Sequence, residues 1–83
     1  MKILDLPDGT PVSIAGNVIN YTSGGYRYML RFPAAPATAT VHELRDGREQ
    51  ITMGTLDKTV LVITGRASII ERIFEKVGGK PAS

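Results

Sequence analysis

The stretch TVLVITGRASIIERIFEKV, residues 59–77, decides the fold of this 83-residue chain. Residues 60–63 form a continuous apolar run of mostly β-branched side chains, which are stiff at χ1 and pack well on a pleated surface. Thr64 and Gly65 end the run, and an apolar run this short favours a strand over a piece of helix. The stretch therefore begins with a predicted strand that is covered on both faces.

The second half of the same stretch predicts an amphipathic helix. Ser68 suits the N-cap position, and Glu71, three residues later, completes a capping box. Gly78 suits the position just after the last helical turn. Five apolar side chains lie at helical spacing on one face: Ile69, Ile70, Ile73, Phe74 and Val77. Because so short a helix is marginal alone, we predict that residues 69–77 dock on a sheet through this apolar face.

Length and composition predict one domain, residues 1–83, with a frayed tail at residues 79–83. Ten Lys and Arg against eight Asp and Glu give a net charge of +2, which permits contact with nucleic acid without requiring it. The chain has no cysteine, so neither a disulfide framework nor a thiolate metal site is expected. No segment resembles a signal peptide or a membrane span, so we expect a cytoplasmic location and no membrane partner.

Upstream of residue 59 the sequence predicts strands separated by turns. A short strand at residues 2–6 precedes a long one at 10–21, an alternating one at 26–32, and a hairpin of 38–44 with 49–53. The apolar phase of the long strand slips at Gly16 and Asn17, which predicts a β-bulge or a sharp bend. This order predicts an α+β fold: a small curved antiparallel sheet, or partly open barrel, of about five strands with one C-terminal helix packed on it.

The Asp46-Gly47 pair predicts the register of the hairpin. Asp-Gly between two strands favours a two-residue type I′ turn. That turn places Arg45 opposite Arg48, and His42 opposite Ile51 on the apolar face. Two opposed arginines suit an anion or an acidic partner, and they equally suit protection of the hairpin against edge-to-edge pairing.

The residues predict no catalytic or metal site. His42 is the single histidine, and no nucleophile or acid stands in a triad-like relation to it. The acids are scattered over turns and the helix, unlike a set of metal ligands. Gly24 and Gly25 lack the spacing of a phosphate-binding loop. We therefore expect a protein that is not an enzyme and has no cofactor, no metal and no small-molecule substrate.

The most suggestive stretch for function is GYRYMLRF, residues 25–32. Aromatic side chains alternating with arginines are typical of single-strand nucleic-acid platforms, in which bases stack on rings and guanidinium groups contact phosphates. The pattern predicts a non-catalytic module that contacts single-stranded nucleic acid through Tyr26, Tyr28, Arg27, Arg31, Arg45 and Arg48. A plainer interpretation puts the tyrosines in the core with Leu30 and Phe32, and the arginines on the solvated face.

The alternative function is a small protein-interaction or assembly module. An example is a phage-like or plasmid-like accessory protein that self-associates through an edge strand or blocks a host partner. A short chain without an active site suits either class. The positions of the four arginines in the fold distinguish a nucleic-acid-binding module from a protein-interaction module. Convergence beside an exposed tyrosine favours nucleic acid, whereas scatter favours a protein partner or a homo-oligomer.

Overall fold

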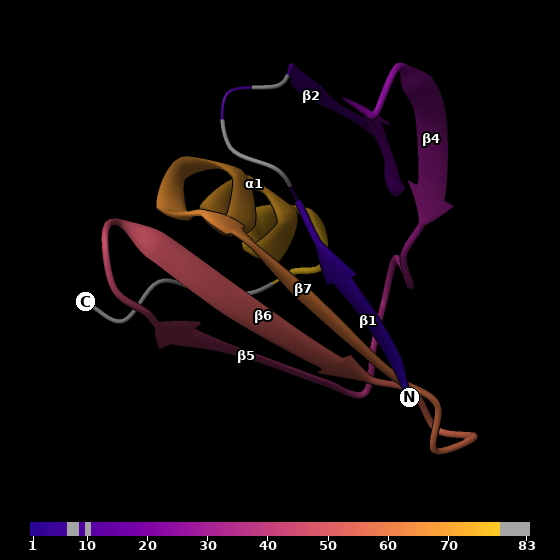
Figure 1. The fold of residues 1–83 in the computed structure, drawn as a ribbon. Helices are drawn as coiled ribbons and strands as arrows, with labels where there is room; N and C mark the ends of the chain where they lie inside the picture. The colour runs from indigo at the N-terminus through magenta and orange to yellow at the C-terminus, as the bar shows by residue number, and fades with distance from the viewer. Residues whose placement is uncertain (7–8, 10, 79–83) are drawn as a thin grey trace.

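A computed structural model describes residues 1–6, 9 and 11–78 (Figure 1). This part of the chain contains strands β1 (Lys2–Asp5), β2 (Val12–Ala15), β3 (Val18–Ser23), β4 (Tyr26–Arg31), β5 (Thr38–Glu43), β6 (Arg48–Gly54) and β7 (Val60–Arg66), followed by helix α1 (Ala67–Lys76). The predicted α+β class and the C-terminal helix are confirmed. The predicted tail at residues 79–83 lies outside the described residues.

The strands form two sheets, neither of them closed, rather than one curled sheet of about five strands. One sheet has the order β1-β7-β6-β5 and the other β2-β3-β4. Within the first, β1 runs parallel to β7, with Lys2 beside Leu61, while the other pairs are antiparallel. A parallel neighbour needs a long crossover, and here the whole intervening chain supplies it. Such a pairing carries no local sequence signal.

The predicted long strand at residues 10–21 is two strands, because the bend at Gly16 is a complete reversal. Ala15 pairs with Val18, leaving Gly16 and Asn17 as a two-residue turn with φ +60° at Gly16. A positive φ at the first central residue fits a type II′ hairpin turn, which favours glycine there. The phase slip in the sequence was therefore a hairpin rather than a bulge.

The β5–β6 hairpin has the predicted turn but not the predicted register. Asp46 and Gly47 have φ of +62° and +73°, the signs that a type I′ turn requires. The amide of Arg48 donates to the Arg45 carbonyl at 3.3 Å, and the amide of Leu44 donates to the Arg48 carbonyl at 2.9 Å. Leu44 and Arg45 thus both lie opposite Arg48. Two residues opposite one form a β-bulge.

The bulge shifts the register by one residue, so the predicted pairing of His42 with Ile51 is wrong. Val41 lies opposite Ile51, and His42 lies opposite Gln50. A shift of one residue moves every side chain of a strand to the other face. His42 is accordingly exposed on the face of the sheet opposite to α1.

Helix α1 packs on β5, β6 and β7, as predicted from its apolar face (Figure 1). Ile70 and Ile73 are fully buried, and Phe74 is partly buried against the same core. The predicted N-cap is wrong: β7 runs directly into the helix, so the cap position falls on Arg66 and no side chain caps it. Over the described residues, no helix has the length and apolarity needed to span a membrane.

The core lies between α1, the four-stranded sheet and one end of the three-stranded sheet. Ile51, Met53 and Ile63 come from β6 and β7 and are fully buried. Ile19 and Leu30, which pair across β3 and β4, close the core from the other sheet. The far end of the β3–β4 hairpin extends beyond this core (Figure 1).

Candidate interaction surface

Strand β4 is an edge strand that presents large side chains to solvent. Within the described residues its only strand neighbour is β3. Tyr26, Tyr28 and Met29 have 71%, 45% and 73% of their surface exposed, whereas Leu30 is buried. The plainer interpretation of this strand therefore holds for Leu30 and Phe32, and it fails for the two tyrosines. The reason is their position along the strand: the end of β4 at Leu30 packs in the core, whereas Tyr26 and Tyr28 lie on the part of β4 that extends beyond the core.

The tyrosines lie on the inner face of the three-stranded sheet, on the side of Leu30. Tyr28 is directly opposite Tyr21 on β3, and their rings stack with centroids 5.2 Å apart and planes 15° apart. Stacking between cross-strand partners stiffens a hairpin and holds the Tyr28 ring in place. Tyr26 lies beyond this pair, near the Gly24-Gly25 turn, with most of its ring in solvent.

The arginines of β4 lie on the opposite, outer face. Alternation along the strand puts Arg27, Met29 and Arg31 together there, and all three are exposed. No Asp or Glu occurs anywhere between Asp8 and Glu43. The three-stranded sheet therefore carries positive charge with no acidic residue to offset it.

The structure does not gather the six predicted site residues on one surface. Arg45 lies at the β5–β6 turn, on the opposite side of the molecule from β4 in Figure 1. Arg48, at the start of β6, donates to the Asp5 carboxylate at 2.6 Å and to the Leu6 carbonyl at 3.4 Å. Arg27 and Arg31 remain with Tyr26 and Tyr28 on β4, on opposite faces of the strand. The sequence predicted that Arg45 alone faces Arg48. In the structure the bulge places both Leu44 and Arg45 opposite Arg48.

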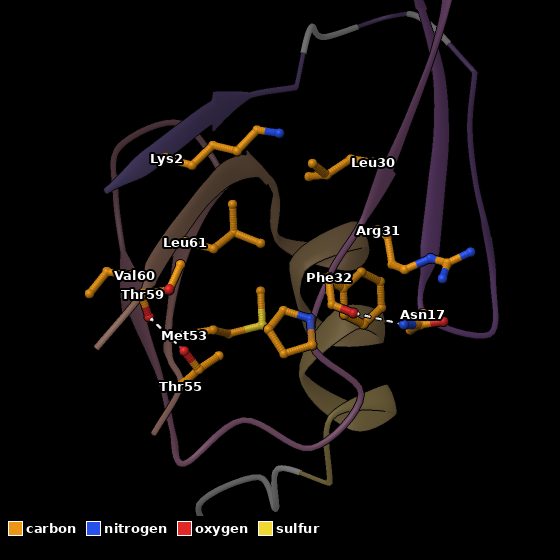
Figure 2. Close-up of a pocket in the computed structure, with 11 residues that line it drawn as sticks. Lys2, Asn17, Leu30, Arg31, Phe32, Met53, Thr55, Thr59, Val60 and Leu61 are labelled. Carbon is orange, nitrogen blue, oxygen red and sulfur yellow. Dashed lines mark hydrogen bonds between the residues drawn. The ribbon is translucent and has the colours of Figure 1, made fainter. Parts of the chain in front are cut away.

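A cleft of about 400 Å³ between the two sheets is a feature that the sequence analysis missed (Figure 2). Its walls are mainly apolar and come from Leu30 and Phe32 on one side and from Met53 and Leu61 on the other. These residues are up to 31 positions apart in the chain. No local pattern indicates such a cleft, because it exists only where the end of β4 approaches β7.

Glu49 is the one buried acid among the described residues. Its side chain is 8% exposed on the core face of β6, and its Oε1 atom has no hydrogen-bond partner. Burial raises the pKa of the Glu49 carboxyl, and the neighbouring carboxylates Glu71 and Glu43 raise it further. In the part of the chain that the structure describes, no cluster of His, Asp and Glu is arranged to hold a metal ion.

Comparison with models of known protein families, with curated proteins and with solved structures finds no match to this chain. The function therefore has to be inferred from the chain's own surface.

Proposed function

We propose that this protein is a non-catalytic protein-interaction module whose edge strand β4 takes up an extended, acidic segment of a partner protein. The observation that carries the proposal is β4 itself, an edge strand on which Tyr26, Tyr28 and Met29 are exposed beside two arginines. An unpaired strand edge binds an extended peptide through main-chain hydrogen bonds, while alternate side chains supply specificity.

The composition of β4 supports a protein partner. Tyrosine, methionine and arginine are the residue types enriched in protein interfaces, and tyrosine and arginine dominate their hot spots. Five of the six β4 residues belong to these three types. Large exposed side chains of this kind lose much water-accessible surface when a partner strand packs beside them.

The two faces of β4 indicate the chemistry of the partner segment. Neighbouring strands place their side chains on the same faces, alternating along the chain. A partner strand beside β4 would put every second side chain next to Arg27 and Arg31, and the others next to Tyr26 and Tyr28. An alternation of acidic and apolar residues meets both requirements, and strands β2, β3 and β4 themselves contain no acid that would repel it.

Single-stranded nucleic acid is the second candidate, favoured by the exposed Tyr26 ring next to Arg27. The arrangement suits it less well. One face of the Tyr28 ring already stacks on Tyr21, and the arginines point to the face of the strand opposite the tyrosines. A base that stacks on Tyr26 would leave its phosphates on the wrong side for Arg27 and Arg31.

The test is an NMR titration of the protein with peptides of alternating Glu and Val, peptides of alternating Lys and Val, and single-stranded oligonucleotides at two salt concentrations. We expect the Glu peptide alone to bind, with the amide shifts centred on β4. Arg27→Ala should weaken this binding, whereas Arg45→Ala, an equal loss of charge at the β5–β6 turn, should not.

Two outcomes would contradict the proposal. Oligonucleotide binding near 50 mM salt that weakens with added salt, with a slope reduced by roughly 0.7 in Arg27→Ala, would favour nucleic acid. A concentration-dependent dimer of the protein alone, with β4 amides at its interface, would make a second copy the occupant of the edge.

A further inference from the structure

We propose that the cleft between the two sheets binds a small aliphatic carboxylate, with the tail between Leu30 and Leu61 and the head group at Lys2. This inference is independent of the proposed function of β4. The volume of the cleft, about 400 Å³, falls in the range of small-molecule sites. Such sites are mainly apolar, with a few polar groups that fix the orientation of the ligand.

The interior of the cleft suits an apolar tail. Leu30, Phe32, Met53 and Leu61 line it, and each is at least nine-tenths buried by the rest of the molecule. Two polar side chains of the wall, Asn17 and Thr55, already have hydrogen-bond partners within the protein. Asn17 donates its side-chain amide to the Phe32 carbonyl at 2.9 Å, and this bond is drawn in Figure 2. An apolar chain therefore enters the cleft without breaking either of these hydrogen bonds.

The rim of the cleft suits a negative head group. Lys2 lies opposite Leu61 in the β1–β7 pair, and Figure 2 shows its side chain reaching across the cleft toward Leu30. Within the described residues, Lys2 makes no ion pair. Arg31 also lines the cleft, but its side chain lies on the outer face of β4 and its guanidinium points away from Leu61 (Figure 2), so Lys2 supplies the positive charge of the cleft.

Among the described residues, no acidic residue lines the cleft to compete for Lys2. The nearest acid along the chain, Asp57, accepts hydrogen bonds from the Thr55 hydroxyl and the Thr59 amide in the turn before β7. These bonds lower the pKa of its carboxyl, so Asp57 is a carboxylate that is already hydrogen-bonded within its own turn. The lining of the cleft therefore offers a ligand the positive charge of Lys2 and no negative charge, which favours an anionic head group over a neutral or cationic one.

The test uses three ligands with the same tail and different head groups: octanoate, octan-1-ol and octylammonium, each below its micelle-forming concentration. In NMR titrations of the full chain, we expect saturable shifts at the methyl groups of Leu30, Met53 and Leu61. Octanoate should bind most tightly and octylammonium most weakly. Added salt should weaken octanoate binding and leave octanol binding unchanged.

Lys2→Gln should weaken octanoate binding by roughly two- to five-fold, the usual worth of an exposed ion pair, and leave octanol binding unchanged. Lys76→Gln, which removes the same charge from the exposed last turn of α1, is the matched control and should change neither. Leu61→Trp should block all three ligands. If that variant does not fold, the methyl shifts of the wild-type protein decide the location.

Absence of saturable shifts at the cleft would overturn the inference. Equal affinity for the three head groups, or an equal effect of the Lys2 and Lys76 changes, would overturn the assignment of an anionic ligand. None of these results bears on peptide binding at the β4 edge, so the two proposals fail separately.

Discussion

At the scale of single residues, the position most at odds with its surroundings is Glu49. Burying a carboxylate costs free energy unless hydrogen bonds compensate, and Oε1 of Glu49 has no hydrogen-bond partner, while Glu43 and Glu71 add repulsion. A folded-state pKa raised above the ordinary value of 4.5 means that the native protein binds more protons than the unfolded chain. The contribution of Glu49 to stability is therefore fully present below pH 4.5 and is lost as the pH rises through the folded-state pKa of this carboxyl.

We predict that Glu49→Gln raises the free energy of unfolding at pH 7 and removes part of the pH dependence above 4.5. The glutamine keeps the shape of the side chain and carries no charge to bury. Urea unfolding at several pH values between 4 and 8 measures the effect, with the exposed helix position Glu75→Gln as the control. A Glu49 variant less stable than the wild type at pH 7 would contradict this account.

At the scale of elements, the β5–β6 hairpin and α1 each depend on a small number of positions. The hairpin reverses at Gly47, where φ is +73° and an added Cβ would meet no atom within 4 Å. Any cost of a side chain there is therefore conformational and not a clash. The helix depends on the two side chains that are fully buried, Ile70 and Ile73.

We predict that Gly47→Val destabilises the protein by about 1–2 kcal/mol or more, because a β-branched residue resists positive φ. Gly47→Asn should cost much less, since asparagine tolerates the left-handed region. Thermal unfolding of the two variants measures the difference. Equal melting temperatures would show that the conformation at residue 47 does not limit the hairpin.

For the helix we predict that Ile73→Ala lowers the free energy of unfolding by about 2–5 kcal/mol, the usual range for a fully buried aliphatic side chain. Phe74→Ala should cost less than the about 3–5 kcal/mol of a fully buried phenylalanine, because Phe74 is only partly buried. Chemical denaturation of both variants tests the order. A larger loss for Phe74 would mean that its ring contributes more to the core than its burial indicates.

At the scale of the whole molecule, the two sheets share one core, but the four-stranded sheet is packed more extensively than the three-stranded sheet. Strands β6 and β7 each have a strand on both sides and α1 across one face. The β3–β4 hairpin is attached at Ile19 and Leu30, while its far end carries exposed side chains on both faces. Local opening free energies follow such differences in buried contacts.

We predict that backbone amides of the distal hairpin, residues 22–27, exchange with solvent much faster than those of β6 and β7. Hydrogen exchange followed by NMR gives the comparison directly, and the amides of Ile51 and Ile63 serve as the protected reference. Binding of an acidic peptide along β4 should slow exchange in the hairpin and leave the reference amides unchanged. Equal protection throughout the chain would show that the hairpin opens only on global unfolding.

The sequence by itself determined the elements whose signals are local. The apolar run after Thr59, the helical stripe through Ile73 and the positive-φ turn at Gly47 each follow from side-chain spacing or backbone sterics. The composition of β4, with tyrosines and arginines alternating, was equally readable, and so was the lack of an acid between Asp8 and Glu43.

Only the tertiary structure decided how these elements are joined and which side chains stay exposed. The parallel pairing of β1 with β7 and the separation of Arg45 from Arg27 both depend on contacts between distant segments. The cleft at Leu61 has the same origin, because its walls come from both sheets. Spacing along a strand specifies which side chains share a face. Whether that face is covered depends on where the rest of the chain ends, and for Tyr26 and Tyr28 the core ends before it reaches them.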